Sequence, residues 1–169
     1  MHALMALILP ALAIGVGATV VLDLWNLFLA RALNMPGPNW GMVGRWVGHF
    51  PKGRFVHQNI AKATPIAGEQ ALGWLAHYLV GIAFAILLLL TQDPQWPLQP
   101  TLAPALIVGV LTVAAPFFLL QPCMGAGVAA SKTPKPNVAR LRSLIGHSVF
   151  GLGLYGSAMA WAWVLGQTA

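Results

Sequence analysis

The sequence predicts an all-α membrane protein: one domain over residues 1–169 that bundles four transmembrane helices, with short amphipathic helices in the first cytoplasmic loop. Of the 169 residues, 58% are hydrophobic and 7% are charged, against about 25% charged residues in an average soluble domain. Four stretches, at about 3–33, 71–90, 101–123 and 144–165, hold the roughly 20 apolar residues that a membrane-crossing helix needs. All nine lysines and arginines lie near two of the connections between these stretches.

The first stretch begins with MHALMALILPALAIGVGATVVL and continues through DLWNLFLARAL before any turn signal. A signal peptide has a positively charged start and an apolar core of about 7–15 residues. This start has no lysine or arginine and its apolar run is longer, so we expect a true span. Pro10 in this stretch, and Pro104 and Pro116 in the third, predict kinks, because membrane helices tolerate proline.

The basic residues predict the orientation. One group lies near the first connection and the other near the last: Arg31, Arg45, Lys52, Arg54 and Lys62, then Lys132, Lys135, Arg140 and Arg142. The middle connection, TQDPQWPLQP, and both chain ends have none. The positive-inside rule therefore places the loops 34–70 and 124–143 in the cytoplasm and both termini outside. Because topology explains the net charge of +6, we expect membrane lipids as partners and no nucleic acid.

The two halves of the chain share a weak repeat. Pro36 in PGPN follows Asp23 by thirteen positions, as Pro134 in PKPN follows Gln121, and each half then contains a His-x-x-x-Gly motif, HYLVG or HSVFG. The pattern favours two parallel-related helical hairpins. The first loop would then hold an insertion of roughly 28 residues. Its mixture of aromatic, aliphatic and basic residues predicts short helices on the inner leaflet, with a solvated loop as the alternative.

Four polar residues are expected near one level of the membrane: Asp23, His77, Gln121 and His147. At about 1.5 Å rise per residue, His77 lies about 9 Å, and His147 about 5 Å, inside the cytoplasmic ends of their spans. Asp23 and Gln121 each follow about one bilayer crossing of apolar residues. Polar residues in spans are costly and are functional candidates by default. The alternative is that the histidines form hydrogen bonds between helices.

Several kinds of chemistry remain open for this layer. Asp23 could orient a histidine ring for acid–base work. His77 and His147 could ligate a haem iron, or with Asp23 a divalent metal. His57 and Glu69, in the first loop, are candidate contributors to the same site.

Other residues suggest contacts or packing. Arg45, Arg54, Arg140 and Arg142 are candidates for contact with lipid or phosphate groups. Small residues lie at helical spacing in the fourth stretch, at Gly146, Gly153, Ser157 and Ala160, and predict close helix packing. The segment GAGVAAS, after Met124, is similarly rich in small residues.

Two stretches carry a family resemblance: GPNWGMVGRWVGHFPKGRFVHQNIAKATPIAGEQALGWLAHYLVG and QPCMGAGVAASKTPKPNVARLRSLIGHSVFGLGLYG. In them the chain resembles a bacterial family of small four-span inner-membrane proteins classified only as a domain of unknown function. The resemblance covers nearly the whole chain. It implies a four-span protein of the bacterial inner membrane, and it brings no catalytic residues. With the orientation that the basic residues predict, both termini would be periplasmic.

Three function classes follow. The first hypothesis is transport of a small solute, an ion or a proton through Asp23, His77 and His147, favoured by the repeat and the prolines within the spans. A chain of 169 residues has little room for an aqueous path, so transport would need a homo-oligomer. The alternatives are a membrane-embedded enzyme or a metal- or haem-binding protein at the inner leaflet, and an accessory subunit of a larger complex. The chain has no nucleophile or zinc-protease motif, so whether it is an enzyme stays open.

Overall fold

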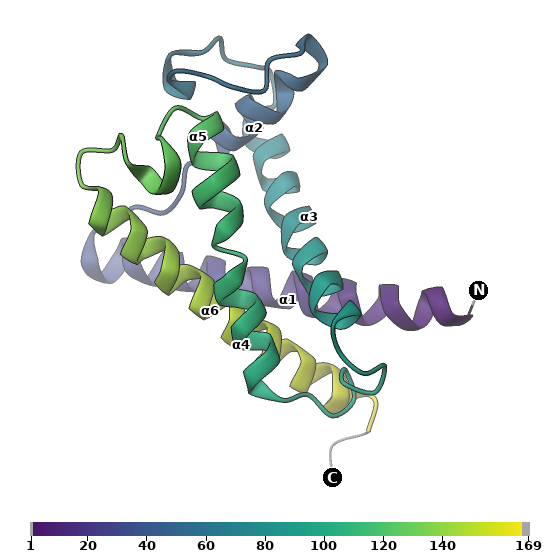
Figure 1. Ribbon diagram of the computed structural model, residues 1–169. Coiled ribbons are helices and arrows are strands. Elements are labelled where there is room, and N and C mark those ends of the chain that lie inside the picture. The colour runs from purple at the N-terminus through teal and green to yellow at the C-terminus, as the bar shows by residue number, and fades with distance from the viewer. Residues whose placement is uncertain (1, 167–169) are drawn as a thin grey trace. The chain divides into compact units, whose positions relative to one another are not determined.

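The computed structural model describes residues 2–166, and this range is helical apart from its connections (Figure 1). The helices are α1 (His2–Leu33), α2 (Trp40–Gly48), α3 (Glu69–Leu90), α4 (Leu102–Leu111), α5 (Gln121–Cys123) and α6 (Pro136–Val164). Short 3-10 turns lie at Phe50–Lys52, Ile60–Lys62 and Val128–Ala130, and a π-helical turn lies at Pro116–Leu120. Met1 and residues 167–169 are not among the described residues. These are the chain ends that the positive-inside rule places on the outer side of the membrane.

Three helices of the described chain are long and apolar enough to cross a membrane: Met5–Leu33, Glu69–Leu90 and Leu102–Cys123. They indicate a multi-pass membrane protein. Three such helices are found and not the four predicted, because α6, which holds nearly all of the expected span 144–165, does not qualify on this criterion. Its glycines and serines, together with His147 and Tyr155, lower the hydropathy of a helix that is otherwise long enough.

The third stretch is interrupted just before Pro116, as that proline predicts, whereas Pro104 lies in the first turn of α4 and does not break it. α4 ends at Leu111, and the helix resumes before Pro116. Proline has no N–H to donate and crowds the preceding turn. A wider turn follows, in which the N–H of Gln121 donates to the carbonyl of Pro116, five residues earlier. Pro10, in contrast, lies inside the continuous helix α1.

The chain divides into two compact units. Unit 1 comprises the described parts of Met1–Gly37, Tyr78–Thr112 and Gly146–Ala169, and therefore takes α1, α4 and most of α3 and α6. Its core is apolar and includes Ile14, Leu88 and Leu154, all fully buried. Unit 2 comprises Pro38–His77 and Val113–Ile145, which together hold most of the two loops predicted to be cytoplasmic.

Small residues bring the helices of unit 1 together. A Cβ atom on Gly153 would lie 3.0 Å from the Cα of Ala18 in α1, and one on Gly109 would lie 2.7 Å from the backbone nitrogen of Gly151. Gly17 of α1 faces Ser157 of α6. The predicted packing role is therefore confirmed for Gly153 and Ser157. Such close approach of backbones is typical of helix pairs in membranes.

The short helix expected in the first loop is present as α2. Asn39 caps its N-terminus, because its side-chain oxygen accepts a hydrogen bond of 3.3 Å from the backbone N–H of Met42. The asparagine of the other Pro-x-Pro-Asn motif has a different place, since Asn137 lies inside α6 and its side chain accepts from Arg140. The asparagines of the two motifs therefore have different structural roles, one as a helix cap and the other within a helix.

Candidate functional site

The four residues of the predicted polar layer fall into both units: Asp23 and His147 into unit 1, His77 and Gln121 into unit 2. In unit 1 the Tyr78 hydroxyl donates a hydrogen bond of 3.0 Å to Asp23 Oδ2, which joins α3 to α1. His147 Nδ1 lies 3.0 Å from the hydroxyl of Thr112, which joins α6 to the end of α4. Asp23 and His147 are thus each paired with a hydroxyl from another part of the chain.

In unit 2, His77 belongs to an aromatic cluster. Its ring stacks on Trp40 with centroids 3.8 Å apart, and meets Trp74 edge to face at 5.8 Å. Gln121 is different, because its side-chain oxygen is buried and has no hydrogen-bond partner within the described chain. A buried acceptor without a partner is costly, which makes Gln121 a position where a further polar group would stabilise the protein.

The described part of the chain contains no cluster of side chains suited to bind a metal ion. Among residues 5–166, whose side chains the structure describes, no three His, Cys, Asp or Glu side chains are gathered so that they could hold a metal ion. His77 stacks on Trp40 and meets Trp74 edge to face, and Nδ1 of His147 lies toward Thr112.

Arg45, predicted to contact lipid or phosphate, is instead bound within unit 2. Its guanidinium forms a two-pronged ion pair with the Glu69 carboxylate, with N–O distances of 2.8 and 2.7 Å. The carboxylate raises the pKa of Arg45 above its usual value, first through this hydrogen bond. Nη1 of the same guanidinium donates to three backbone carbonyls, those of Ile60, Ala61 and Ala63. Arg45 therefore ties α2 to the start of α3 and to the loop between them.

The segment from Phe55 to Ala63 has little regular structure, yet it is held at many points. Trp46 Nε1 donates to the carbonyl of Phe55 at 2.7 Å. The backbone N–H groups of His57 and Ile60 donate to the carbonyls of Cys123 and Met124, at 2.7 and 3.1 Å. With the Arg45 contacts, these bonds fix the loop against the segment that follows α5.

One residue of this loop, His57, contacts a second histidine, His49, through its ring. His49 Nδ1 lies 2.8 Å from His57 Nε2, and His49 is almost fully buried. Desolvation, followed by the nearby charges of His49 and Arg54, lowers the pKa of His57 below its usual value. The lowered pKa favours the neutral form of the His57 ring. Its other nitrogen, Nδ1, is buried and lacks a partner within the described chain.

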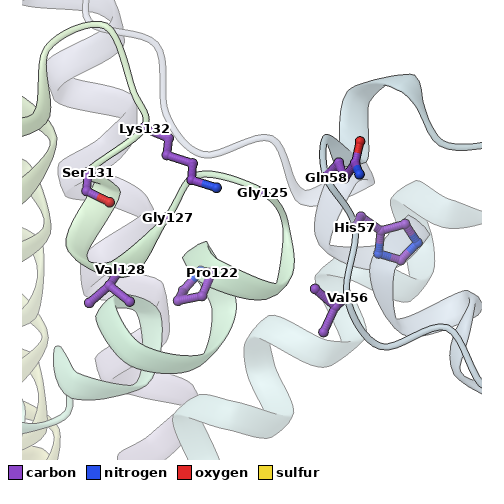
Figure 2. A pocket seen from close by; sticks show the side chains of 9 residues that line it. All are labelled: Val56, His57, Gln58, Pro122, Gly125, Gly127, Val128, Ser131 and Lys132. Atoms are coloured by element: carbon purple, nitrogen blue, oxygen red, sulfur yellow. The ribbon is translucent and has the colours of Figure 1, made fainter.

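A hollow of about 670 Å³ opens beside this loop, within unit 2 (Figure 2). Val56, His57 and Gln58 form one wall, and the glycine-rich loop that follows Pro122 forms the other. A second hollow of about 770 Å³ shares Val56, His57 and Gln58, and is lined further by Arg54, Asn59, Lys62, Ala63 and Thr64. We call the two together the basic hollow. Its volumes fall in the range of about 300–1,000 Å³ that is usual for small-molecule sites.

The glycine-rich wall needs its glycines. Gly125 and Gly127 have φ angles of +91° and +76°, a left-handed region that favours glycine. A Cβ atom on Gly125 would strike the carbonyl of Gln58, and one on Gly127 would strike the hydroxyl of Ser131. Arg140 fixes this wall from behind, since its Nε donates to the carbonyl of Ala129 at 2.8 Å. The sequence predicted only packing for this segment.

The other three arginines predicted to contact lipid or phosphate groups differ in where their side chains lie. Arg54 is exposed and lines the basic hollow. Arg140 is used inside the protein, and Arg142 is half-buried in α6. Lys62, Lys132 and Ser131, which also line the basic hollow, were not predicted as site residues. Their signal in the sequence is weak, because the two walls lie some 65 residues apart in the chain and nothing local connects them.

Comparison with known proteins agrees with the resemblance in its broad terms. Residues 12–161 match DUF2938, a family described as a protein of unknown function. No match is found among the curated proteins or among the solved structures. The match covers most of the chain, including both units, and the chain therefore belongs to the DUF2938 family.

Proposed function

We propose that this protein is a small transporter of the bacterial inner membrane, in which α6 forms a fourth span and both termini are periplasmic. α6 has 29 residues, and at about 1.5 Å rise per residue it is about 43 Å long, enough to cross the bilayer. Its glycines pack directly on α1 and α4, both of which lie in candidate spans. A helix packed in this way needs less hydropathy of its own, because part of its surface faces protein rather than lipid.

The observation that carries the transport proposal is the pair of polar contacts in unit 1. Asp23–Tyr78 and His147–Thr112 place a carboxylate and an imidazole among helices that are otherwise apolar. Ionisable groups in spans commonly mark paths for ions or protons. The transported species would be a proton, an ion or a small solute whose charge these groups recognise.

The hydrogen bonds define how His147 would take part. The Thr112 hydroxyl donates to the carbonyl of Gly109 at 2.6 Å, and a hydroxyl has one hydrogen to give. Nδ1 of His147 must therefore donate to the Thr112 oxygen, which leaves Nε2 as the acceptor of the neutral ring. His147 can take up a proton at Nε2 without breaking its bond to Thr112.

The fourth span is tested by locating the C-terminus. With four spans the N- and C-termini lie on the same side of the membrane, whereas with three they lie on opposite sides. We expect a reporter that works only in the periplasm to be active when it is fused after Ala169. A reporter that works only in the cytoplasm should be inactive at the same position. A C-terminal reporter that works in the cytoplasm, beside an N-terminal one that works in the periplasm, would show that α6 does not cross.

Transport is tested in proteoliposomes with a pH-sensitive dye inside. We expect wild-type protein to dissipate an imposed pH gradient faster than protein-free liposomes do. Asp23→Asn should slow this flux toward the rate of protein-free liposomes, because it removes the ionisable carboxylate that the proposal places on the proton path. Asp93→Asn is the matched control: Asp93 is exposed on the connection between α3 and α4, where its side chain accepts from the backbone of Gln95. Equal flux from folded wild-type, Asp23→Asn and Asp93→Asn protein would contradict a role for Asp23 in proton transport.

A further inference from the structure

Unit 2 carries a strong positive charge that the fold leaves largely uncompensated. It holds eight lysines and arginines and one carboxylate, that of Glu69, a formal net charge of +7 with histidines neutral. Glu69 is bound on both oxygens by Arg45. The other cations of unit 2 therefore have no carboxylate inside the unit to balance them.

Three of these cations line the basic hollow. Arg54 and Lys62 lie on the side of the Phe55–Ala63 segment, and Lys132 lies on the glycine-rich side. Among the residues that line the basic hollow, none is an aspartate or a glutamate. Figure 2 shows Lys132 and Ser131 on one wall, across from Gln58 and His57 on the other.

The walls are fixed before any ligand arrives. One wall is held by Arg45, Trp46 and the backbone bonds to Cys123 and Met124. The other is held by Arg140 and by the bond from the Lys132 N–H to the carbonyl of Ala126. Gly125 lets the two walls touch at Gln58. A pre-organised site loses less conformational entropy on binding than a mobile loop would.

We propose that the basic hollow of unit 2 binds a phosphate-type oxyanion, with Arg54, Lys62 and Lys132 as its charged contacts. Lysine and arginine are the usual partners of phosphate oxygens, because hydrogen bonds between two ionised groups are the strong ones. Ser131 and Gln58 add neutral donors. The phosphate belongs either to a soluble compound or to the headgroup of an anionic lipid. The inference does not depend on the transport proposal, which concerns residues of unit 1.

Some neighbours of the basic hollow are apolar and exposed. Phe55, Val56 and Val128 have exposed fractions of 54%, 71% and 52%. Acyl chains or the apolar edge of a lipid headgroup would cover such side chains, whereas inorganic phosphate would leave them in water. The two sources of phosphate therefore make different demands on the same site, and an experiment can tell them apart.

The test is a pair of titrations on purified full-length protein in an uncharged maltoside detergent at constant ionic strength. One arm uses inorganic phosphate with chloride as its reference. The other uses phosphatidylglycerol in mixed micelles, with phosphatidylcholine as its reference. We expect binding in at least one arm, weakened about tenfold or more by Lys132→Gln or Arg54→Gln, the size expected for losing a charged hydrogen bond. The matched control is Lys135→Gln, an exposed position on the same loop that does not line the basic hollow.

Each outcome decides the inference. Binding of phosphate that Lys132→Gln weakens and Lys135→Gln does not identifies a soluble ligand, and the same pattern with phosphatidylglycerol alone identifies a headgroup. Equal weakening by Lys132→Gln, Arg54→Gln and Lys135→Gln would show attraction by net charge and overturn the site. Absence of binding in both arms, with the protein monodisperse by gel filtration, would overturn it as well.

Discussion

Replacing Gly73 with alanine should lower the free energy of unfolding by about 3 kcal/mol or more, the upper end of the usual cost of overpacking. Gly73 lies in α3 where this helix packs against α2, and a Cβ atom at this position would strike the carbonyl of Trp40 in α2. In the same way, a Cβ atom on Gly44 of α2 would strike the carbonyl of Glu69 in α3. Both obstacles are backbone atoms, so no side-chain rotation can relieve them. α2 and α3 would have to separate, and Arg45 would lose its reach to Glu69.

The measurement is thermal unfolding in detergent, followed by tryptophan fluorescence, since the rings of Trp40 and Trp74 meet where α2 packs against α3, tilted by 50° with centroids 5.8 Å apart. Gly156→Ala is the matched control: Gly156 lies inside α6, and nothing lies within 4 Å of a Cβ placed there. In a helix interior, alanine is favoured over glycine by up to about 1 kcal/mol, so this variant should unfold at the wild-type temperature or above. A Gly73→Ala protein as stable as Gly156→Ala would mean that α2 does not lie against α3 in this way.

Arg45→Gln is expected to destabilise the protein more than any other single loss of charge in unit 2. The substitution removes five hydrogen bonds, two to Glu69 and three to backbone carbonyls. It also leaves the Glu69 carboxylate partly buried without its cation, and breaking one partner of such a pair costs more than the pair itself contributes. Arg45→Lys should recover only part of the loss, because an ammonium cannot match the planar fork that meets both carboxylate oxygens.

Arg54→Gln makes the same chemical change nine residues away, at an exposed position. Its unfolding temperature should stay close to that of the wild type, because surface substitutions usually change stability by less than about 0.5 kcal/mol. Limited proteolysis gives a second comparison, in which Arg45→Gln should expose the Phe55–Ala63 segment to cleavage. Equal resistance of the two variants would show that Arg45 does not hold this loop.

Much of the fold could be predicted because apolar runs and breaks are local signals. The first three long helices, the kink near Pro116 and the short helix α2 all follow from residues within a few turns. α6 was harder to judge. Its helicity follows from its sequence, but the glycines and His147 that pack it against α1 and α4 also dilute the apolar run on which a span is predicted.

The candidate site could be predicted only in part, because its contacts join distant segments. Asp23 and His147 could be singled out as polar residues among apolar ones, but their partners Tyr78 and Thr112 carry no signal that pairs them. Arg45 resembled other basic loop residues until the structure placed Glu69, 24 residues away, against it. The basic hollow needs both loops of unit 2 to be folded before it exists.

The π-helical turn at Pro116–Leu120 has a consequence for how this stretch of chain is compared with others. Such a turn closes over five residues instead of four, so it accommodates one residue more than an α-helix would at the same place. Every residue after it, including Gln121 and Cys123, is rotated by about 100° from the direction that an uninterrupted helix starting at Val113 would give. A helical wheel drawn through Val113–Cys123 therefore assigns Gln121 to the wrong face. Deleting one residue between Pro116 and Leu120 would restore the α-helical hydrogen-bond pattern and would leave the buried, unpartnered oxygen of Gln121 facing the same neighbours as now.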